Sequence, residues 1–124
     1  MTTIFNYTNT FTLESGETLP GFHLAYTTHG ILNASKDNVV WIFHALTANS
    51  NPVEWWPGLV GDGKFFDPAK YFIICVNKPG SPYGSISPLS KNPVTMQPYY
   101  DKFPVFTIRD MIRSYQQLKE YLGI

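Results

Sequence analysis

The residues from Val39 to Thr47 constrain the fold of this chain more than any other segment. They begin with Val-Val-Trp-Ile-Phe, continue as His-Ala-Leu-Thr, and are followed by small and polar residues as far as Pro52. An unbroken apolar run rich in β-branched and aromatic residues predicts a strand buried on both faces of a parallel sheet. Ligands of such sheets bind beyond the carboxyl ends of the strands. We therefore take His44–Thr47 as a candidate active-site loop; the alternative is an ordinary strand end with a histidine buried in the core.

Other apolar patterns predict alternating strands and helices. Strands are expected at Phe11–Leu13, at Phe22–Thr28 with one face in solvent, and at Tyr71–Val76. Pro52–Val60 has apolar residues at helical spacing and predicts a short helix or turn. Together these elements indicate an α/β layer architecture.

The clearest predicted helix follows Thr107. Its apolar stripe has helical spacing and consists of Ile108, Met111, Ile112, Tyr115, Leu118 and Leu122. Thr107 and Asp110 form a predicted capping box, and Gly123 stands where a glycine ends a helix. A helix in this place is expected to lead into another strand of the sheet, so the sequence predicts that residues 1–124 are part of a larger domain.

The segment from Asn77 to Lys102 is rich in Pro, Gly, Ser and Asn and has no apolar periodicity. A loop of this length is usually functional or is packed by its own side chains. The aromatic residues expected to pack it are Tyr83, Tyr99, Tyr100 and Phe103.

Composition excludes several functional classes. The chain of 124 residues has nine basic and nine acidic residues, so we expect no nucleic-acid or membrane-surface binding. The single cysteine, Cys75, lies in an apolar run and has no partner for an intrachain disulfide. These features, with no signal peptide and no apolar stretch of membrane-spanning length, predict a soluble cytoplasmic protein.

Common catalytic motifs are incomplete. Gly58–Lys64 resembles a P-loop, but Phe65 replaces the Ser or Thr that would hold magnesium. Gly80–Gly84 has Pro82 where a nucleophile elbow requires serine. The three histidines lack the spacing of a metal site, so no metal is expected.

Several short motifs occur in the order seen in one enzyme family. The most specific are His44-Ala-Leu-Thr47, Trp56-Pro-Gly-Leu-Val-Gly61 and Thr107-Ile-Arg-Asp-Met111, supported by Tyr83-Gly84-Ser85, Asn92-Pro93 and Phe103-Pro104. With these motifs the chain resembles the homoserine O-acetyltransferases over nearly its whole length. That family has the α/β-hydrolase fold, a mostly parallel sheet with crossover helices, and serves methionine biosynthesis. The resemblance implies that residues 1–124 are the N-terminal part of a single α/β-hydrolase domain.

The resemblance also implies site residues. Members use serine, histidine and aspartate to take an acetyl group from acetyl-CoA and pass it to the homoserine hydroxyl. The Leu46 backbone N–H is then the expected oxyanion-hole donor, Thr47 is expected to line the substrate site, and His44 to support the loop rather than transfer protons. Acetyl-CoA is expected as a co-substrate and not as a bound cofactor. The resemblance is also compatible with a homodimer of the complete enzyme.

The family's catalytic serine, aspartate and histidine have no counterparts in this chain, so by itself it is expected to be inactive. Two interpretations stay open: the N-terminal portion of an acetyltransferase, or a short non-catalytic protein that binds a partner through an open sheet edge. A third is that the complete enzyme is an esterase or an O-succinyltransferase. Lys78-Pro79 and Pro82 depart from the family pattern and are compatible with an altered acyl-donor pocket or a different substrate.

Overall fold

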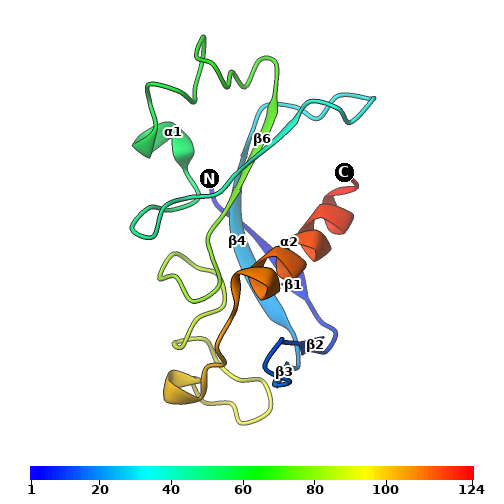
Figure 1. Ribbon diagram of the computed structural model, residues 1–124, viewed down its shortest axis with the longest axis vertical. Helices are drawn as coiled ribbons and strands as arrows, with labels where there is room; N and C mark the ends of the chain where they lie inside the picture. Colours follow the sequence, from blue (N-terminus) through cyan, green and yellow to red (C-terminus); the bar gives the residue numbers. More distant parts are fainter.

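A twisted four-stranded sheet crossed by one long helix forms the centre of the computed structural model, which describes residues 1–124 (Figure 1). A two-stranded ribbon lies at one end of the sheet. The strands are β1 (Thr3–Tyr7), β2 (Phe11–Thr12), β3 (Thr18–Leu19), β4 (Phe22–His29), β5 (Val39–Ile42) and β6 (Phe72–Val76), and the helices are α1 (Pro52–Trp55), the 3-10 turn η1 (Tyr100–Lys102) and α2 (Ile108–Leu122).

The sheet has the strand order β1-β4-β6-β5 and is mixed. The pairs β1–β4 and β4–β6 are antiparallel, and only β5 and β6 run parallel, with Val39 opposite Phe72. The expected strands at β4, β5 and β6 are confirmed, but this part of the sheet is less parallel than predicted. β1 was not predicted from sequence, although Thr3–Tyr7 alternates between an exposed Ile4 and a buried Phe5.

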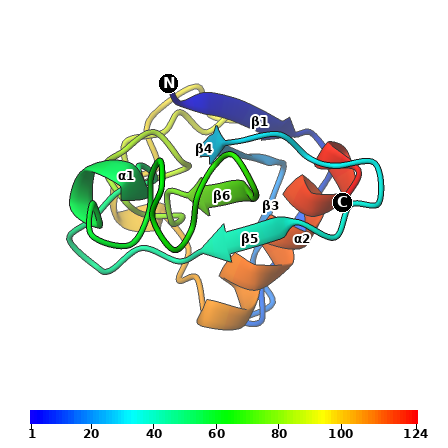
Figure 2. The same cartoon turned by 90° about the horizontal axis from the view of Figure 1, so that it is seen from above.

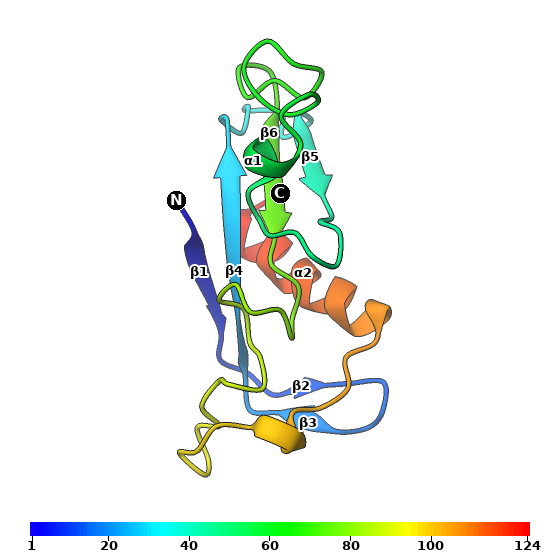
Figure 3. The ribbon, with the colours of Figure 1, turned by 90° about the vertical axis from the view of Figure 1, so that its left-hand side faces the viewer.

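Helix α2 lies across one face of the sheet, as Figures 2 and 3 show from above and from the side. Its Tyr115 and Leu118 are buried in the main core with Leu24 of β4 and Ile74 of β6. Both predicted caps are confirmed: Thr107 forms the capping box, and Gly123 ends the helix with φ of 71°.

The carboxylate of Asp110 links the start of α2 to the amino-terminal part of the chain. It is fully buried, and it accepts hydrogen bonds from the backbone N–H groups of Thr107 at 3.1 Å and Glu14 at 3.0 Å. Burial opposes ionisation, but these hydrogen bonds outweigh it and hold the pKa of Asp110 below its ordinary value. The capping carboxylate therefore also anchors the helix to the turn that follows β2.

The predicted apolar stripe of α2 is buried over only part of its width. Ile108 is 79% exposed and Ile112 is 37% exposed. The sheet ends at β5, whose outer edge is unpaired, and Ile112 lines an apolar hollow beside Trp41 and Phe43. The stripe is incompletely covered because no further strand lies beyond β5.

The two predictions of strand burial are both wrong in detail. β5 was expected to be buried on both faces, but three of its four residues are only partly buried because it is the edge strand. β4 was expected to have one face in solvent, yet Ala25, Tyr26 and Thr27 are all buried. The loops that follow β5 and β6 cover the second face of β4, a contact between distant segments that strand periodicity does not reveal.

The long loop after β6 is packed by only two of its four expected aromatic residues. Tyr99 is buried and packs edge-to-face on Phe103, with ring centroids 6.0 Å apart. Tyr83 and Tyr100 are exposed, which contradicts that prediction, and backbone hydrogen bonds organise their part of the loop instead. None of the helices has the length and apolar character that a membrane crossing requires.

Candidate functional site

Two loops leave the sheet at the same edge, where β5 and β6 end. Because these strands are parallel, their carboxyl ends are adjacent. The first loop runs from residue 43 to 51 and the second from residue 77 to 85. The candidate site is the junction between them.

His44 fastens the two loops together. Its side chain is buried, its Nδ1 lies 2.7 Å from the carbonyl oxygen of Ala45, and its Nε2 lies 3.1 Å from the backbone nitrogen of Lys78. The carbonyl can only accept and the backbone N–H can only donate, so the imidazole is neutral, with its proton on Nδ1. Burial lowers the pKa of His44, and the positive charge of Lys78 acts in the same direction. Both ring nitrogens are occupied, which is consistent with a supporting role.

Leu46 and Thr47 occupy the middle of a turn in the first loop. The turn is closed by a hydrogen bond of 3.0 Å from the Ala48 N–H to the Ala45 carbonyl, the same carbonyl that His44 contacts. The side chain of Leu46 is 91% exposed, and its backbone N–H makes no hydrogen bond within the chain. Thr47 is also exposed. The turn thus presents an unused backbone donor at the carboxyl end of β5.

Asn77 forms a second clamp between the loops, and the sequence analysis did not identify it. It is almost completely buried; its Oδ1 accepts from the Ser50 N–H at 2.8 Å, and its Nδ2 donates to Ser50 Oγ at 2.9 Å and to the Tyr83 carbonyl at 3.1 Å. Ser50 Oγ also lies 2.9 Å from Thr27 Oγ1 on β4. The available signal was a polar amide immediately after the apolar strand β6.

Ser85 completes the polar junction beneath the second loop. Its hydroxyl donates to the Asn77 carbonyl at 2.5 Å and accepts from the Ala25 N–H at 2.9 Å. Like Ser50, it is buried and its hydroxyl is held by neighbouring groups. Neither serine contacts a histidine, so neither has the hydrogen-bonded base that activates a serine nucleophile.

The remaining reactive groups do not complete a catalytic centre. Burial raises the pKa of Cys75 to about 12, so this side chain is a neutral thiol. No three His, Cys, Asp or Glu side chains gather in a way that could hold a metal ion. Lys78, one of the departures from the family pattern, lines a small apolar hollow with Phe43 and Met111. These residues provide a supported backbone donor but no nucleophile.

Solved structures resemble the whole chain closely. Esterase E22 matches with a TM-score of 0.85 and 30% identity, covering 100% of this chain and 38% of its own. Homoserine O-acetyltransferase from Bacillus anthracis matches with a TM-score of 0.85 and 34% identity, covering 100% of this chain and 37% of its own. No family model matches the sequence. The sheet, the crossing helix and these matches define the chain as part of an α/β-hydrolase fold.

Curated proteins that resemble the chain in sequence carry the name of one enzyme. Homoserine O-acetyltransferase from Cyclobacterium marinum is 54% identical over 98% of this chain and 34% of its own length. The enzyme of the same name from Salinibacter ruber is 47% identical over 93% of this chain and 33% of its own length. The chain is therefore similar in sequence to homoserine O-acetyltransferases over nearly its whole length, and it spans about a third of the length of these relatives.

Proposed function

We propose that the protein transfers an acetyl group from acetyl-CoA to the hydroxyl of homoserine, a step in methionine biosynthesis. In this proposal, residues 1–124 are the N-terminal part of a single α/β-hydrolase domain, and the catalytic serine, histidine and aspartate come from a part of the polypeptide outside them. The observation that supports the proposal is the unbonded Leu46 N–H in the loop after β5, because in this fold a loop that follows a strand of the sheet supplies one oxyanion donor.

The proposed chemistry proceeds in two acyl-transfer steps. A serine hydroxyl, deprotonated by histidine, attacks the thioester carbonyl and releases the CoA thiol, which leaves an acetyl-enzyme. The homoserine hydroxyl then attacks that ester, and the serine departs with its proton restored. Each tetrahedral intermediate carries a negative oxygen that needs backbone donors. Leu46 supplies one of these donors, and the exposed Thr47 lines the homoserine side.

The loop contacts support this role because a donor must be held in place before charge develops. The Leu46 turn is fixed at Ala45 by the imidazole of His44, which is in turn bound to the loop after β6. Farther along the same loop, Ser50 is fixed by Asn77. A donor supported in this way pays little reorganisation energy during the reaction.

The test removes the N–H without removing the turn. Proline is favoured at the second position of such turns, and Leu46→Pro deletes the donor, while the matched control Leu46→Ala keeps it. In the full-length protein, measured by CoA release with homoserine, we expect kcat to fall roughly 10²–10³-fold for Leu46→Pro and less than about threefold for Leu46→Ala. Circular dichroism checks that both variants fold. If Leu46→Pro and Leu46→Ala both fold and are equally active, the Leu46 N–H is not an oxyanion-hole donor.

Ester hydrolysis is the second candidate function, favoured by the match to esterase E22 across the whole chain. It is distinguished by the product, because an esterase releases acetate whether or not homoserine is present. Replacing acetyl-CoA by succinyl-CoA in the same assay tests the O-succinyltransferase alternative. If no longer polypeptide carries these residues, the remaining alternative is a short non-catalytic binding protein, and the intact mass of the native polypeptide decides this.

Two further features belong to the proposal. A cytoplasmic location is supported by the lone buried Cys75, and fractionation of the source cells tests it. A homodimer of the complete protein is proposed from the family resemblance alone, and sedimentation of the full-length protein tests it.

A further inference from the structure

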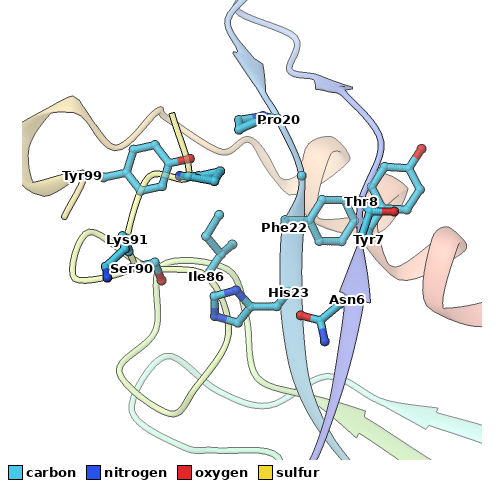
Figure 4. Close-up of a pocket in the computed structure, with 12 residues that line it drawn as sticks. Asn6, Tyr7, Thr8, Pro20, Phe22, His23, Ile86, Ser90, Lys91 and Tyr99 are labelled. Carbon is cyan, nitrogen blue, oxygen red and sulfur yellow. The ribbon is translucent and has the colours of Figure 1, made fainter. Parts of the chain in front are cut away.

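A hollow of about 370 Å³ lies away from the candidate site, between the end of β1, the start of β4 and the loop after β6 (Figure 4). It shares no residue with the two loops at the carboxyl ends of β5 and β6. Its size falls in the range of small-molecule sites. Nothing in the proposed acyl transfer uses it.

The walls of this hollow are held by backbone hydrogen bonds. The Ile86 N–H donates to the His23 carbonyl at 2.9 Å, which fastens the loop to β4. The Tyr99 N–H donates to the Ser90 carbonyl at 3.0 Å, and Lys91 pairs with Pro98 in an isolated antiparallel bridge. The hollow is therefore preformed by its own loop and does not depend on a ligand for its shape.

The polar groups around the hollow favour an anion. Lys91 provides a positive charge, the side chains of Asn6 and Ser90 can donate hydrogen bonds, and no carboxylate lines the space. Figure 4 shows the His23 ring projecting from β4 toward Ser90 and Lys91. Burial lowers the pKa of His23, so this ring is neutral at pH 7 and Lys91 is the charged group of the site.

Tyr99 belongs to the wall of the hollow, but its hydroxyl does not face the open space. Its side chain is 7% exposed, and its hydroxyl is buried without a hydrogen-bond partner. Burial raises the pKa of Tyr99, so the hydroxyl keeps its proton and remains a donor. Because this hydroxyl has almost no accessible surface, a molecule in the hollow can contact other atoms of Tyr99 but not its hydroxyl.

Apolar side chains form the rest of the lining. Phe22 and Ile86 are both buried, at 5% and 3% exposure, and Tyr7 lies beside them. A ligand that fits this combination has a compact negative end and an apolar body. A phosphate fits less well, because the hollow has a single cation and no arginine fork.

We propose that this hollow binds a small organic carboxylate, with its oxygens held by Lys91 and Ser90 and its hydrocarbon part against Phe22 and Ile86. The binding does not require the proposed acyl transfer. Its failure is therefore distinguishable from failure of that activity, which CoA release measures separately.

The experiment measures binding of hexanoate to the full-length protein by calorimetry, with hexanamide as the uncharged probe of equal shape. We expect hexanoate to bind roughly tenfold more tightly than hexanamide, because charged hydrogen bonds are the stronger ones. Lys91→Gln should weaken the binding of hexanoate roughly tenfold and leave the binding of hexanamide unchanged. Ser90→Ala, which deletes only the hydroxyl, should weaken the binding of hexanoate about fivefold. The matched control Lys102→Gln changes an exposed lysine that does not line this hollow, and it should have no effect.

Three results would overturn the proposal. One is the absence of hexanoate binding at concentrations of about 20 mM, well above the Kd of weak small-ligand sites. Another is equal affinity for hexanoate and hexanamide, which would indicate purely apolar binding. The third is hexanoate binding that Lys91→Gln and Ser90→Ala do not change, which would place the ligand elsewhere on the protein.

Discussion

Replacing Asn77 by aspartate, N77D, tests whether the buried amide holds the two loops together. The side chains have nearly the same shape, but the amide Nδ2 that donates to Ser50 Oγ at 2.9 Å and to the Tyr83 carbonyl at 3.1 Å becomes an oxygen that cannot donate when ionised. The Ser50 hydroxyl can reverse its role and donate, whereas the Tyr83 carbonyl would face a negative oxygen. Two donor contacts are lost in a position that is 1% exposed.

The magnitude follows from these contacts. Each lost hydrogen bond costs about 1 kcal/mol, and a buried charge without a partner raises the total to roughly 3–5 kcal/mol at pH 7. Burial also raises the pKa of the introduced carboxyl above its unfolded value of about 3.9. The ionised carboxylate therefore lowers the free energy of unfolding only at a pH above the unfolded-state pKa of about 3.9. Below it the carboxyl is neutral, its O–H can donate to one of the two acceptors, and most of the stability returns.

Urea denaturation of the full-length protein at pH 7 and at pH 4 measures this effect, as the difference in unfolding free energy between N77D and the unsubstituted protein at each pH. We expect about 3 kcal/mol or more at pH 7 and about 1 kcal/mol at pH 4. Ser50→Ala, which keeps the backbone N–H bound to Asn77, is the matched control. It should lower the unfolding free energy by about 1 kcal/mol at both pH values. The reasoning is refuted if the N77D difference is the same at the two pH values.

Two further predictions concern the loops and the strand connections. Because burial lowers the pKa of His44 below 6.5, protonation on acidification would remove the acceptor of the Lys78 N–H, and stability is lost as the pH falls below that value. The difference in unfolding free energy between His44→Gln and the unsubstituted protein should therefore become smaller below pH 6.5. A difference that does not change with pH would contradict the assignment of a neutral His44 imidazole. Gly30→Ala should lower the unfolding free energy by more than about 3 kcal/mol, since a Cβ there would lie 2.1 Å from the Tyr71 carbonyl oxygen. Gly16→Ala has a similar φ of 88° but no atom within 4 Å, and its cost in thermal denaturation should stay near 1 kcal/mol.

Features set by neighbouring residues were predicted well from the sequence. The caps of α2 depend on Thr107, Asp110 and Gly123, which lie within or next to the helix, and both formed as predicted. β6 was predicted because an uninterrupted apolar run needs cover on both sides wherever it lies. β1 was missed because a strand of five residues with one buried face gives a short and weak pattern.

Features that depend on distant segments were not predicted. The exposure of Ile108 and Ile112 is decided by where the sheet ends, and the helix pattern alone cannot report that. The clamp between Asn77 and Ser50 joins residues 27 positions apart and exists only because β5 and β6 are parallel neighbours. The role of Leu46 was assigned by resemblance, and the structure adds the contacts that hold its turn.

The double role of Asp110 has a consequence for synthesis on the ribosome. Its carboxylate binds the Glu14 N–H across 96 residues of chain, so the early turn meets its partner only after α2 has been made. At about 5–20 residues per second, that delay is roughly 5–20 seconds, far longer than the microseconds a β-hairpin needs to form. The apolar side chains of β1 and β4 that α2 later covers are therefore exposed during this interval, and a chaperone or a second nascent chain would meet them then.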